Sequence, residues 1–490
     1  MVDIPLAEWF PDRAPLGVPV SLATNVIPWA DGYKSFPSFS VVSTNALTAK
    51  YQGGAFARDI TSNVYEFAGD ATKLYSLGSG AWTDVSRLAG GAYTTATDDW
   101  WECAQWGNTV IAVNGHTDAP QVMTLGGANF AALGGSPPKA RHIAVIRDFV
   151  VLGNVNDGTA YPSRVQWSAI NNSTSWAVSA ATQADYQDLQ GDNGGWVQKI
   201  LGGEYGLVFQ ERAISRMTYV GSPVIFQFDL IEKNRGTMAP QGIVGWGNMA
   251  FFLADDGFYA MVGGAPAVPI GDGKVDRYFL NDYQTGNAHL ITGAIDPVNK
   301  IVMWAYPGAG FSAGTTNQIL IYNWVYKKWS LATVTIEGLV RYAAQGYTME
   351  TLDNLSGSID ALTTSLDSRT YTGGAMTLSA FNSSHKIGTF TGTAMDATVD
   401  TGEIELNKSQ RTTVQEVRPL VDGNAASVTV GTRNLVSDTV SFGSAISQNA
   451  SGFCPTRTNA NFHRFRVTTT GAFNFMQGVK VKHAAIGNGR

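Results

Sequence analysis

The sequence predicts an all-β protein whose largest part is a β-propeller of six or seven blades. A hairpin pattern recurs about every 45 to 50 residues, the period of a four-stranded propeller blade. The composition agrees, because 54 glycines, 11% aromatic and only 15% charged residues among 490 suit many turns and much buried sheet. Irregular spacing between the hairpins leaves a set of stacked β-sandwiches as the alternative fold.

The clearest hairpin covers residues 246–262. Two short apolar arms flank an Asp-Asp-Gly turn at residues 255–257, where Gly tolerates positive φ and Asp binds its own backbone. Each arm is too short for a stable helix and rich in aromatic residues, which favours strands. The Trp-Gly-Asn opening at 246–248 recurs at 106–108, so we interpret the hairpin as the repeated unit of the chain.

Five further segments have the same pattern of two apolar arms around a turn. We therefore expect six hairpins, at residues 64–77, 109–125, 148–169, 205–220, 246–262 and 300–324. After four of them a further short run begins with an aromatic residue, where the outer strand of a blade would fall. These runs begin at Trp82, Trp176, Phe226 and Trp329.

The two ends of the chain differ from this middle part, which we place at residues 49–345. Residues 1–48 contain six prolines, which rule out a long helix and a central strand, so we expect an extended arm pinned against its own body or a neighbouring subunit. Residues 346–490 predict a C-terminal β-rich sandwich domain, or a last propeller blade followed by a small sandwich, with a less strand-like connector at 347–369. Its expected strands are 375–381, 387–390, 402–406, 427–430, 462–467 and 478–482.

Charge is unevenly distributed along the chain, whose formal net charge is −6. Residues 408–490 hold ten Lys or Arg and three Asp or Glu, a net charge of +7, which leaves −13 for the remainder. Strict alternation places Arg464, Arg466, Lys480 and Lys482 on one cationic sheet face, a candidate assembly or DNA-facing surface. A chance bias in loop composition would give the same count.

No motif predicts an enzyme active site. The Gly-x-Ser-x-Gly pattern at residues 310–314 serves a nucleophile only on a strand-to-helix turn, and here it lies between two β arms. The six histidines and the distant Cys103 and Cys454 lack metal-ligand spacing. The Asp-rich turns at 255–257 and 271–274 lack the alternating ligands of a calcium loop. We expect no metal, no cofactor and no catalysis.

A carbohydrate-binding or glycan-cleaving propeller remains the competing class. The acidic and aromatic residues that such a protein would use in an axial cleft are Asp98, Asp99, Asp185, Asp188 and Asp192, with Trp100, Trp101 and Trp167 for stacking. The tryptophans serve core packing equally well. No run of 18 apolar residues predicts a membrane span, and residues 1–11 lack the features of a secretory signal.

Several stretches resemble one family of viral proteins. Residues 25–37 (Asn-Val-Ile-Pro-Trp-Ala-Asp-Gly-Tyr-Lys-Ser-Phe-Pro) are similar to the opening of tail hub or nozzle proteins of short-tailed bacteriophages, the packaged-DNA stabilisation family. Residues 67–86 resemble their first blade, and residues 402–406, 417–423 and 487–490 resemble their C-terminal part. The resemblance covers most of the chain and concerns structure, with no catalytic residues to carry over.

This resemblance implies a structural virion protein assembled in the host cytoplasm. It implies a homo-oligomeric ring, usually a hexamer, that continues the portal–adaptor channel, retains packaged DNA and conducts it at ejection. The implied partners are portal or adaptor proteins, tail fibre or tail needle proteins, and double-stranded DNA in transit without sequence specificity, with no membrane insertion. An acidic wall would avoid gripping DNA, so we expect the basic segment to face an acidic protein; the rival arrangement places it in the lumen.

Overall fold

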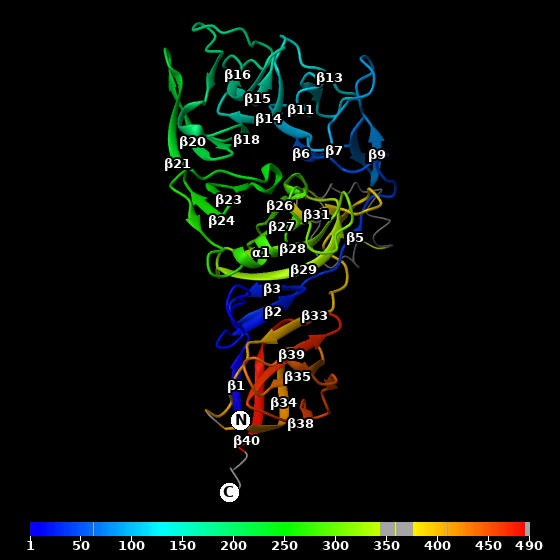
Figure 1. The fold of residues 1–490 in the computed structure, drawn as a ribbon. Coiled ribbons are helices and arrows are strands. Elements are labelled where there is room, and N and C mark those ends of the chain that lie inside the picture. Colours follow the sequence, from blue (N-terminus) through cyan, green and yellow to red (C-terminus); the bar gives the residue numbers. More distant parts are fainter. Residues whose placement is uncertain (62, 344–357, 359–375, 409, 486–490) are drawn as a thin grey trace.

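The protein has a broad head and a narrower stem, both made almost wholly of strands (Figure 1). The computed structural model describes residues 1–61, 63–343, 358, 376–408 and 410–485. It contains 3% helix and 53% strand, so the predicted all-β class is confirmed. Over the described ranges, the head contains six antiparallel sheets of four strands, the stem contains a six-stranded sheet, and a ten-stranded sheet extends through both.

Four consecutive sheets make up the first part of the head, and their strands follow one another in chain order. The strands are β6 (Gly54–Arg58), β7 (Val64–Gly69), β8 (Leu74–Gly78), β9 (Ala81–Asp84); β10 (Glu102–Trp106), β11 (Thr109–Val113), β12 (Gln121–Thr124), β13 (Ala131–Ala132); β14 (Lys139–Ile146), β15 (Phe149–Asn156), β16 (Ala160–Trp167), β17 (Asp185–Asp188); and β18 (Val197–Leu201), β19 (Gly206–Gln210), β20 (Ala213–Gly221), β21 (Ile225–Lys233).

Three more groups of four strands complete the head. They are β22 (Val244–Trp246), β23 (Met249–Ala254), β24 (Gly257–Val262), β25 (Val268–Pro269); β26 (Thr292–Asp296), β27 (Ile301–Tyr306), β28 (Thr316–Asn323), β29 (Lys328–Ile336); and β30 (Gly338–Ala343), β31 (Met376–Phe381), β32 (Ile387–Thr389) with β5 (Ser40–Val41). The last group takes its fourth strand from the N-terminal arm.

The first strands of these groups, which we call the inner strands, form a closed circuit of contacts. β6 contacts β10, β10 contacts β14, and β14 contacts β18. The circuit continues through the 3-10 turn η2 (Pro240–Gly242) and β22 to β26, then β30, which returns to β6. Stacked sandwiches would not bring the last group back onto the first, so the head is β-propeller-like.

All six predicted hairpins are present, and each forms the second and third strands of one group. The repeated Trp-Gly-Asn stretch is a two-residue turn between first and second strands, because Trp106 pairs with Thr109 and Trp246 with Met249. Gly107 and Gly247 have φ of 54° and 57°, a conformation that favours glycine at this position.

Three of the four aromatic-led runs are outer strands, as expected, since Trp82, Phe226 and Trp329 lie in β9, β21 and β29. The run at Trp176 is not a strand, and β17 forms that edge of its sheet. The Trp176 side chain is buried in the core below its loop, and its Nε1 donates to the Ser173 carbonyl oxygen. Its aromatic character therefore reflects packing of a loop.

Two sheets that face each other form the stem. One has the order β3 (Val26–Trp29), β4 (Gly32–Ser35), β40 (Phe475–Ala485), β34 (Thr412–Asp422), β38 (Cys454–Ala460), with β1 (Val2–Pro5) on β40. The other continues from β29 through β2 (Val20–Thr24), β33 (Ala397–Thr401), β39 (Phe462–Thr469), β35 (Ala426–Arg433) and β36 (Ser441–Phe442), with β37 (Ile446–Ser447) on β35. β35 contacts β34 and β38 across the shared core.

The N-terminal arm is pinned against its own chain, one of the two options expected. Its five strands lie in three sheets: β1, β3 and β4 in the first stem sheet, β2 between β29 and β33, and β5 in the head. Buried side chains anchor it along its length, among them Trp9, Val20 and Tyr33. The arm therefore joins stem and head.

The boundary expected at residues 345/346 falls inside one sheet, and the sheet pairing agrees with the alternative of a last propeller blade followed by a small sandwich. β30 and β31 lie on either side of it and pair in one sheet, from Gly338 with Phe381 to Ala343 with Met376. The propeller-like head thus extends to about β32, and the expected connector at 347–369 lies outside the described residues. The strand expected at 402–406 is also absent as a strand: Glu403 and Ile404 make single bridges, and β33 takes that place.

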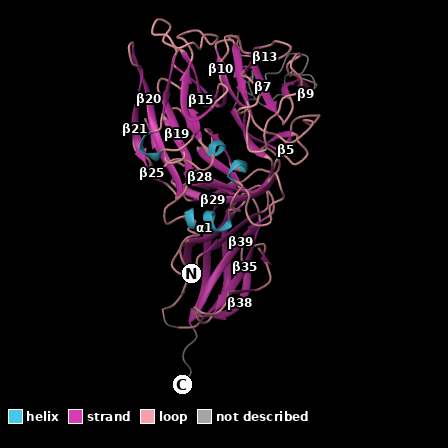
Figure 2. Ribbon diagram, turned by 45° about the horizontal axis from the view of Figure 1, so that its top comes forward, coloured by secondary structure: helices cyan, strands magenta, loops and turns pink. Residues whose placement is uncertain are grey.

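In the described residues, helix is confined to four short segments (Figure 2): α1 (Asp276–Asp282), the turn η2, and the 3-10 turns η1 (Gly191–Asn193) and η3 (Ala288–Leu290). Within the described part of the chain, no helix has the length and apolar character needed to cross a membrane. One hydrophobic cluster runs through both parts of the molecule. It joins Phe258 and Trp329 of the head to Val399, Phe465 and Val481 of the stem.

Candidate functional site

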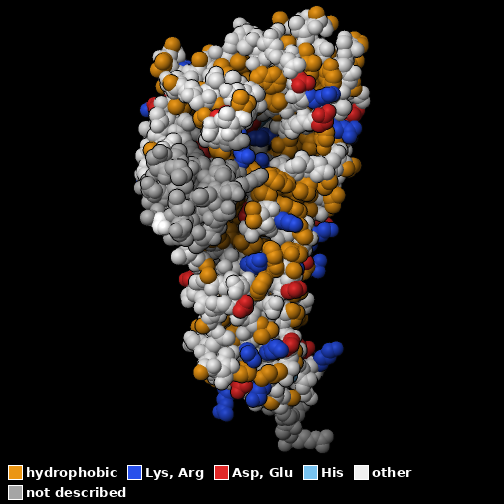
Figure 3. All heavy atoms as spheres, turned by 180° about the vertical axis from the view of Figure 1, so that it is seen from behind, with side chains coloured by type: hydrophobic (Ala, Val, Ile, Leu, Met, Phe, Trp, Pro, Cys, Tyr) orange, Lys and Arg blue, Asp and Glu red, His pale blue; other side chains and the backbone are white. Residues whose placement is uncertain are grey.

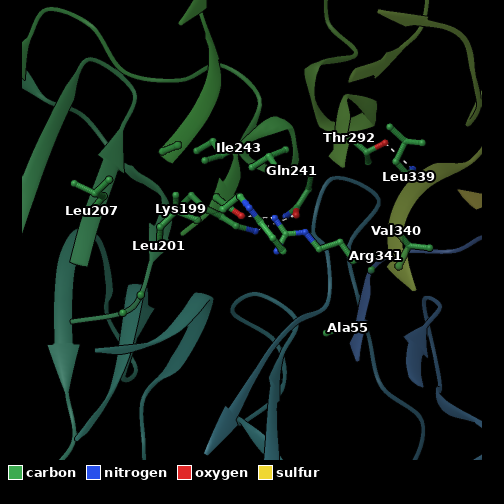
Figure 4. A pocket seen from close by; sticks show the side chains of 18 of the residues that line it. Ala55, Lys199, Leu201, Leu207, Gln241, Ile243, Thr292, Leu339, Val340 and Arg341 are labelled. Atoms are coloured by element: carbon green, nitrogen blue, oxygen red, sulfur yellow. Dashed lines mark hydrogen bonds between the residues drawn. The ribbon is translucent and has the colours of Figure 1, made fainter. Parts of the chain in front are cut away.

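A cavity of about 790 Å³ lies among the inner strands of the head (Figure 4). Residues of β6, β18, β22, β26 and β30 line it, so it is enclosed by groups that are far apart in sequence. Ligand sites in proteins fall in this range of volume and often occupy the junction of several elements. Its wall combines aromatic side chains, Tyr205 and Trp246 among them, with two cationic side chains, Lys199 and Arg341.

Arg341 is the most unusual residue of this cavity. It lies on β30 in the run Leu339-Val340-Arg341-Tyr342, whose other three members are buried apolar or aromatic residues. Its Nη2 donates to the backbone carbonyl oxygen of Gly245 on β22, and no described carboxylate forms an ion pair with it. Burial lowers the pKa of this guanidinium.

Lys199 belongs to a compact polar cluster beside Arg341. Its Nζ lies 2.7 Å from Oε1 of Glu102 and 3.1 Å from Oε1 of Gln241, whose Nε2 donates to Glu102 at 3.0 Å. His142 Nδ1 lies 3.1 Å from the same Glu102 oxygen. Burial alone would raise the pKa of Glu102, but Lys199 and His142 outweigh it and lower that pKa to about 2.

The acidic residues considered for an axial cleft do not meet there. Asp185 and Asp188 lie on β17, the edge strand farthest from β14 in its sheet, and Asp188 pairs with Arg164 at 2.7 Å. Asp99 pairs with Arg141 at 3.2 Å, and burial raises its pKa. Asp98 is exposed, 3.6 Å from His289, and Asp192 lies in η1.

The tryptophans considered for stacking are core residues. Trp100, Trp101 and Trp167 are buried, and their indole Nε1 atoms donate to the carbonyl oxygens of His289, Asp70 and Gln183. Trp100 and Trp101 also line the cavity among the inner strands, whereas Trp167 does not. The Gly-x-Ser-x-Gly segment lies in the loop between β27 and β28, as expected. Cys103 and Cys454 are free, and burial raises the pKa of the Cys103 thiol to about 12. Within the described residues, no three His, Cys, Asp or Glu side chains are placed to hold a metal ion.

The four basic residues of the C-terminal segment do not form one face. Arg464 and Arg466 lie on β39, whereas Lys480 and Lys482 lie on β40 in the other stem sheet. The apolar residues that alternate with them, Phe465 and Val481 for example, meet in the shared core, so the two cationic pairs point away from each other. Alternation was present in each strand, but sequence could not show that the strands belong to opposing sheets.

Arg464 and Arg466 share one buried carboxylate, which compensates part of their positive charge. Asp400 on β33 is fully buried and accepts hydrogen bonds from Arg464 Nη2 at 2.8 Å and from Arg466 Nε and Nη2 at 2.8 and 2.9 Å. Lys480 lies 3.4 Å from Asp3 and Lys482 3.6 Å from Glu416. Seen from behind, the free end of the stem shows basic side chains with acidic ones among them (Figure 3).

Sequence reasoning missed Arg341 and the Glu102 cluster. The only local signal for Arg341 is a single charge inside an apolar strand of the type that lines a propeller axis. The Glu102 cluster gave no signal, since Glu102, Lys199 and Gln241 come from β10, β18 and η2. Their proximity depends on the closed circuit of inner strands.

No family model and no curated protein matches the chain. Solved structures match weakly. The extracellular domain of BT4673 from B. thetaiotaomicron is 9% identical, with a TM-score of 0.43 over 85% of this chain and 46% of its own. A nidogen/laminin complex structure is 13% identical, with a TM-score of 0.31 over 47% of this chain and 87% of its own. Apo AztD from Citrobacter koseri is 11% identical, with a TM-score of 0.30 over 58% and 89%.

Proposed function

We propose that this chain is a structural subunit of a bacteriophage tail channel, in which a ring of copies, usually six, retains packaged DNA and conducts it at ejection. The proposal rests on the resemblance of residues 25–37 and 67–86 to tail hub proteins, and the fold is compatible with it. In this proposal the head is a seven-bladed propeller, closed by β5, and the stem is a β-sandwich. The protein is a virion component whose neighbours are portal or adaptor proteins and tail fibre or needle proteins.

The structural observation that supports the proposal beside this resemblance is the ten-stranded sheet that runs from head to stem. It passes from β26 in the head to β36 in the stem without a break in strand pairing. A flexible linker would let head and stem move independently, whereas a shared sheet holds them as one elongated body. A subunit that carries load along a tail needs such continuity, and a freely diffusing binding module does not.

The glycan-cleaving alternative is disfavoured by the chemistry of the cavity among the inner strands of the head, which we call the axial cavity. A glycosidase pairs a carboxylate with a carboxylic acid whose pKa is raised. Glu102 has instead a pKa lowered to about 2, and the Glu204 carboxylate at the cavity wall is 81% exposed and lies 3.5 Å from Arg147 Nε. We therefore propose a non-enzymatic role.

The surface of the stem is less positive than the charge of residues 408–490 alone would make it. The +7 of residues 408–490 is offset in the stem by acidic residues from other segments, including Asp3, Asp400 and Glu403. We therefore propose that the docking surface includes Lys480 and Lys482, which are partly exposed. It does not include Arg464 and Arg466, because both bind Asp400. An acidic partner surface remains the proposed match.

The test combines assembly state with particle phenotype. We expect purified protein, alone or with its portal neighbours, to form rings whose mass is a small-integer multiple of the 52.3 kDa chain, visible by negative-stain microscopy. Particles made without it should lose packaged DNA. Particles that keep their DNA and a complete tail would contradict the proposal. Specific glycan turnover by the purified protein would favour the alternative.

A further inference from the structure

We propose that the axial cavity of the head binds a small organic oxyanion, with its carboxylate or phosphate group held by Arg341. This inference is independent of a tail function, since it concerns one chain and a free small molecule. It begins from an imbalance of charge. Two cations, Lys199 and Arg341, line the cavity, and one buried carboxylate, Glu102, lies within bonding distance of Lys199. The lining also includes the carboxylate of Glu204, which is 81% exposed and lies 3.5 Å from Arg147.

Arg341 is the group whose charge is left unmatched. Arg341 is partly buried, and a charge that is withdrawn from water is normally paired, because removing it from water without compensation is costly. Among the described residues its recorded partner is the neutral Gly245 carbonyl, which uses Nη2 and leaves further donors of the guanidinium for a ligand. Figure 4 shows the Arg341 side chain extending into the cavity toward Lys199 and Gln241.

The neighbouring carboxylate Glu102 does not pair with Arg341. Burial alone shifts the pKa of Arg341, with no contribution from a described acid, and the cationic partners of Glu102 are Lys199 and His142. Glu102 already accepts from Lys199, Gln241 and His142 on the same oxygen, Oε1. This network holds the Lys199 ammonium beside the cavity and fixes its orientation. Both cations are thus positioned by protein contacts before any ligand enters, which reduces the cost of ordering them.

The lining indicates the class of ligand. A guanidinium presents a planar fork that matches a carboxylate or phosphate bidentately, and these contacts are the strong class of hydrogen bond. Tyr205, Leu207 and Trp246 supply an apolar and aromatic wall to the same cavity. A volume of about 790 Å³ exceeds what an inorganic ion fills, so we assign an organic anion with a ring or short hydrocarbon portion.

The glycines of the cavity do not contribute to this assignment. A Cβ at Gly54 would lie 2.2 Å from the Phe67 carbonyl oxygen, and one at Gly202 would lie 2.1 Å from that of Val145. These positions are glycine because neighbouring strands pack closely against them. The recognition chemistry therefore comes from Arg341 and Lys199.

The first experiment measures binding of phenyl phosphate and benzoate to the full-length chain by isothermal titration calorimetry, with phenol as the uncharged counterpart. We expect at least one of the anions to bind one per chain with a Kd below about 1 mM, and phenol to bind at least about tenfold more weakly. R341Q should weaken anion binding at least about tenfold, whereas R411Q, at an exposed arginine, should leave it unchanged. Absence of binding by both anions, or unchanged binding by R341Q, overturns the proposal.

A second experiment needs no variant, in case R341Q does not fold. Phenylglyoxal modifies accessible arginines, and peptide mass spectrometry reports the extent at each site. We expect saturating phenyl phosphate to protect Arg341 in the native chain and to leave modification of Arg411 unchanged. Equal modification of Arg341 with and without the anion would show that the anion does not sit there, and the assignment would then be wrong.

Discussion

At the scale of single residues, buried carboxylates decide much of the behaviour of this protein. Asp400 lies between two arginines, and Glu102 lies beneath a lysine and a histidine. Asp276 is different, because Gly257 and Gly271 pack so closely on its carboxyl group that a Cβ at either would fall within 2.3 Å of it. Asp400 therefore matters as a counter-ion, and Asp276 as a group whose pKa is shifted.

Replacing Asp400 with Asn should destabilise the stem strongly. The substitution leaves the guanidinium groups of Arg464 and Arg466, 17% and 34% exposed, without their shared counter-ion. We expect a loss of about 3 kcal/mol in the free energy of unfolding, measured by urea denaturation. The charge reversal R464E/R466E should be at least as harmful.

Lys480→Glu together with Lys482→Glu provides the matched control. Both lysines are partly exposed and pair with exposed acids at longer distances, so their loss should change stability by less than about 1 kcal/mol. If D400N were as mild as this control, Asp400 would not anchor the two arginines.

Asp276 should make stability depend on pH. Burial, and then the nearby Asp12, Asp272 and Asp256, raise its pKa to about 7, whereas the unfolded value is 3.8. The native state then binds more protons than the unfolded state between these values, so stability falls as pH rises from about 4 to about 7 and levels off above that.

The variant D276N tests whether Asp276 causes this fall in stability with rising pH. The Asn oxygen can still accept the Phe258 N–H bond that Asp276 Oδ1 accepts, while its neutral amide cannot titrate. Urea midpoints measured across this range should decline less in D276N than in the wild type. D255N, at an exposed turn position, should follow the wild type. Parallel curves for D276N and wild type would contradict the assignment.

At the scale of elements, the N-terminal arm is the segment on which most depends. β2 is the strand between β29 of the head and β33 of the stem, pairing in parallel with the first and antiparallel with the second. β5 completes the sheet of β30 to β32, and Val42 N–H donates to the Ile387 carbonyl oxygen beside it. Removing the arm would leave β29 and β33 without the strand that joins them, and β32 without its outer neighbour.

Deletion of residues 1–43 should therefore abolish cooperative folding, because it removes β1 to β5 and the buried Trp9, Val20 and Tyr33. Thermal melting monitored by near-ultraviolet circular dichroism should show no sharp transition. Deletion of residues 1–5 removes only β1, whose sole partner is β40, and should leave a sharp transition at lower temperature. A sharp native-like melt after the longer deletion would show that the arm is dispensable.

The elements themselves were largely predictable, and their partners were not. Hairpins around local turns, such as the one at residues 255–257, need only neighbouring sequence, and all six are present. The pairing of β5 with β32 joins residues more than 300 positions apart, and no turn signal reports it. For the same reason Arg341 could be noticed only as an isolated charge, and the basic strands β39 and β40 were assigned to one face.

At the scale of the whole molecule, head and stem share one core. The same hydrophobic cluster holds Trp304 and Trp329 of the head and Val428, Phe465 and Val479 of the stem. We therefore expect the stem segment, residues 390–490, not to fold when expressed alone, because it lacks β1 to β4 and the edge provided by β29. Dispersed amide resonances from that fragment in solution would contradict this.

The pairing of β1 with β40 has a practical consequence. Val2 lies opposite Val481, so the start of the chain and the last described strand meet at the free end of the stem, far from the head (Figure 1). A fluorescent protein or gold-binding tag fused upstream of Val2 would mark that pole. In electron micrographs of any assembly, the label would give the polarity of each copy directly.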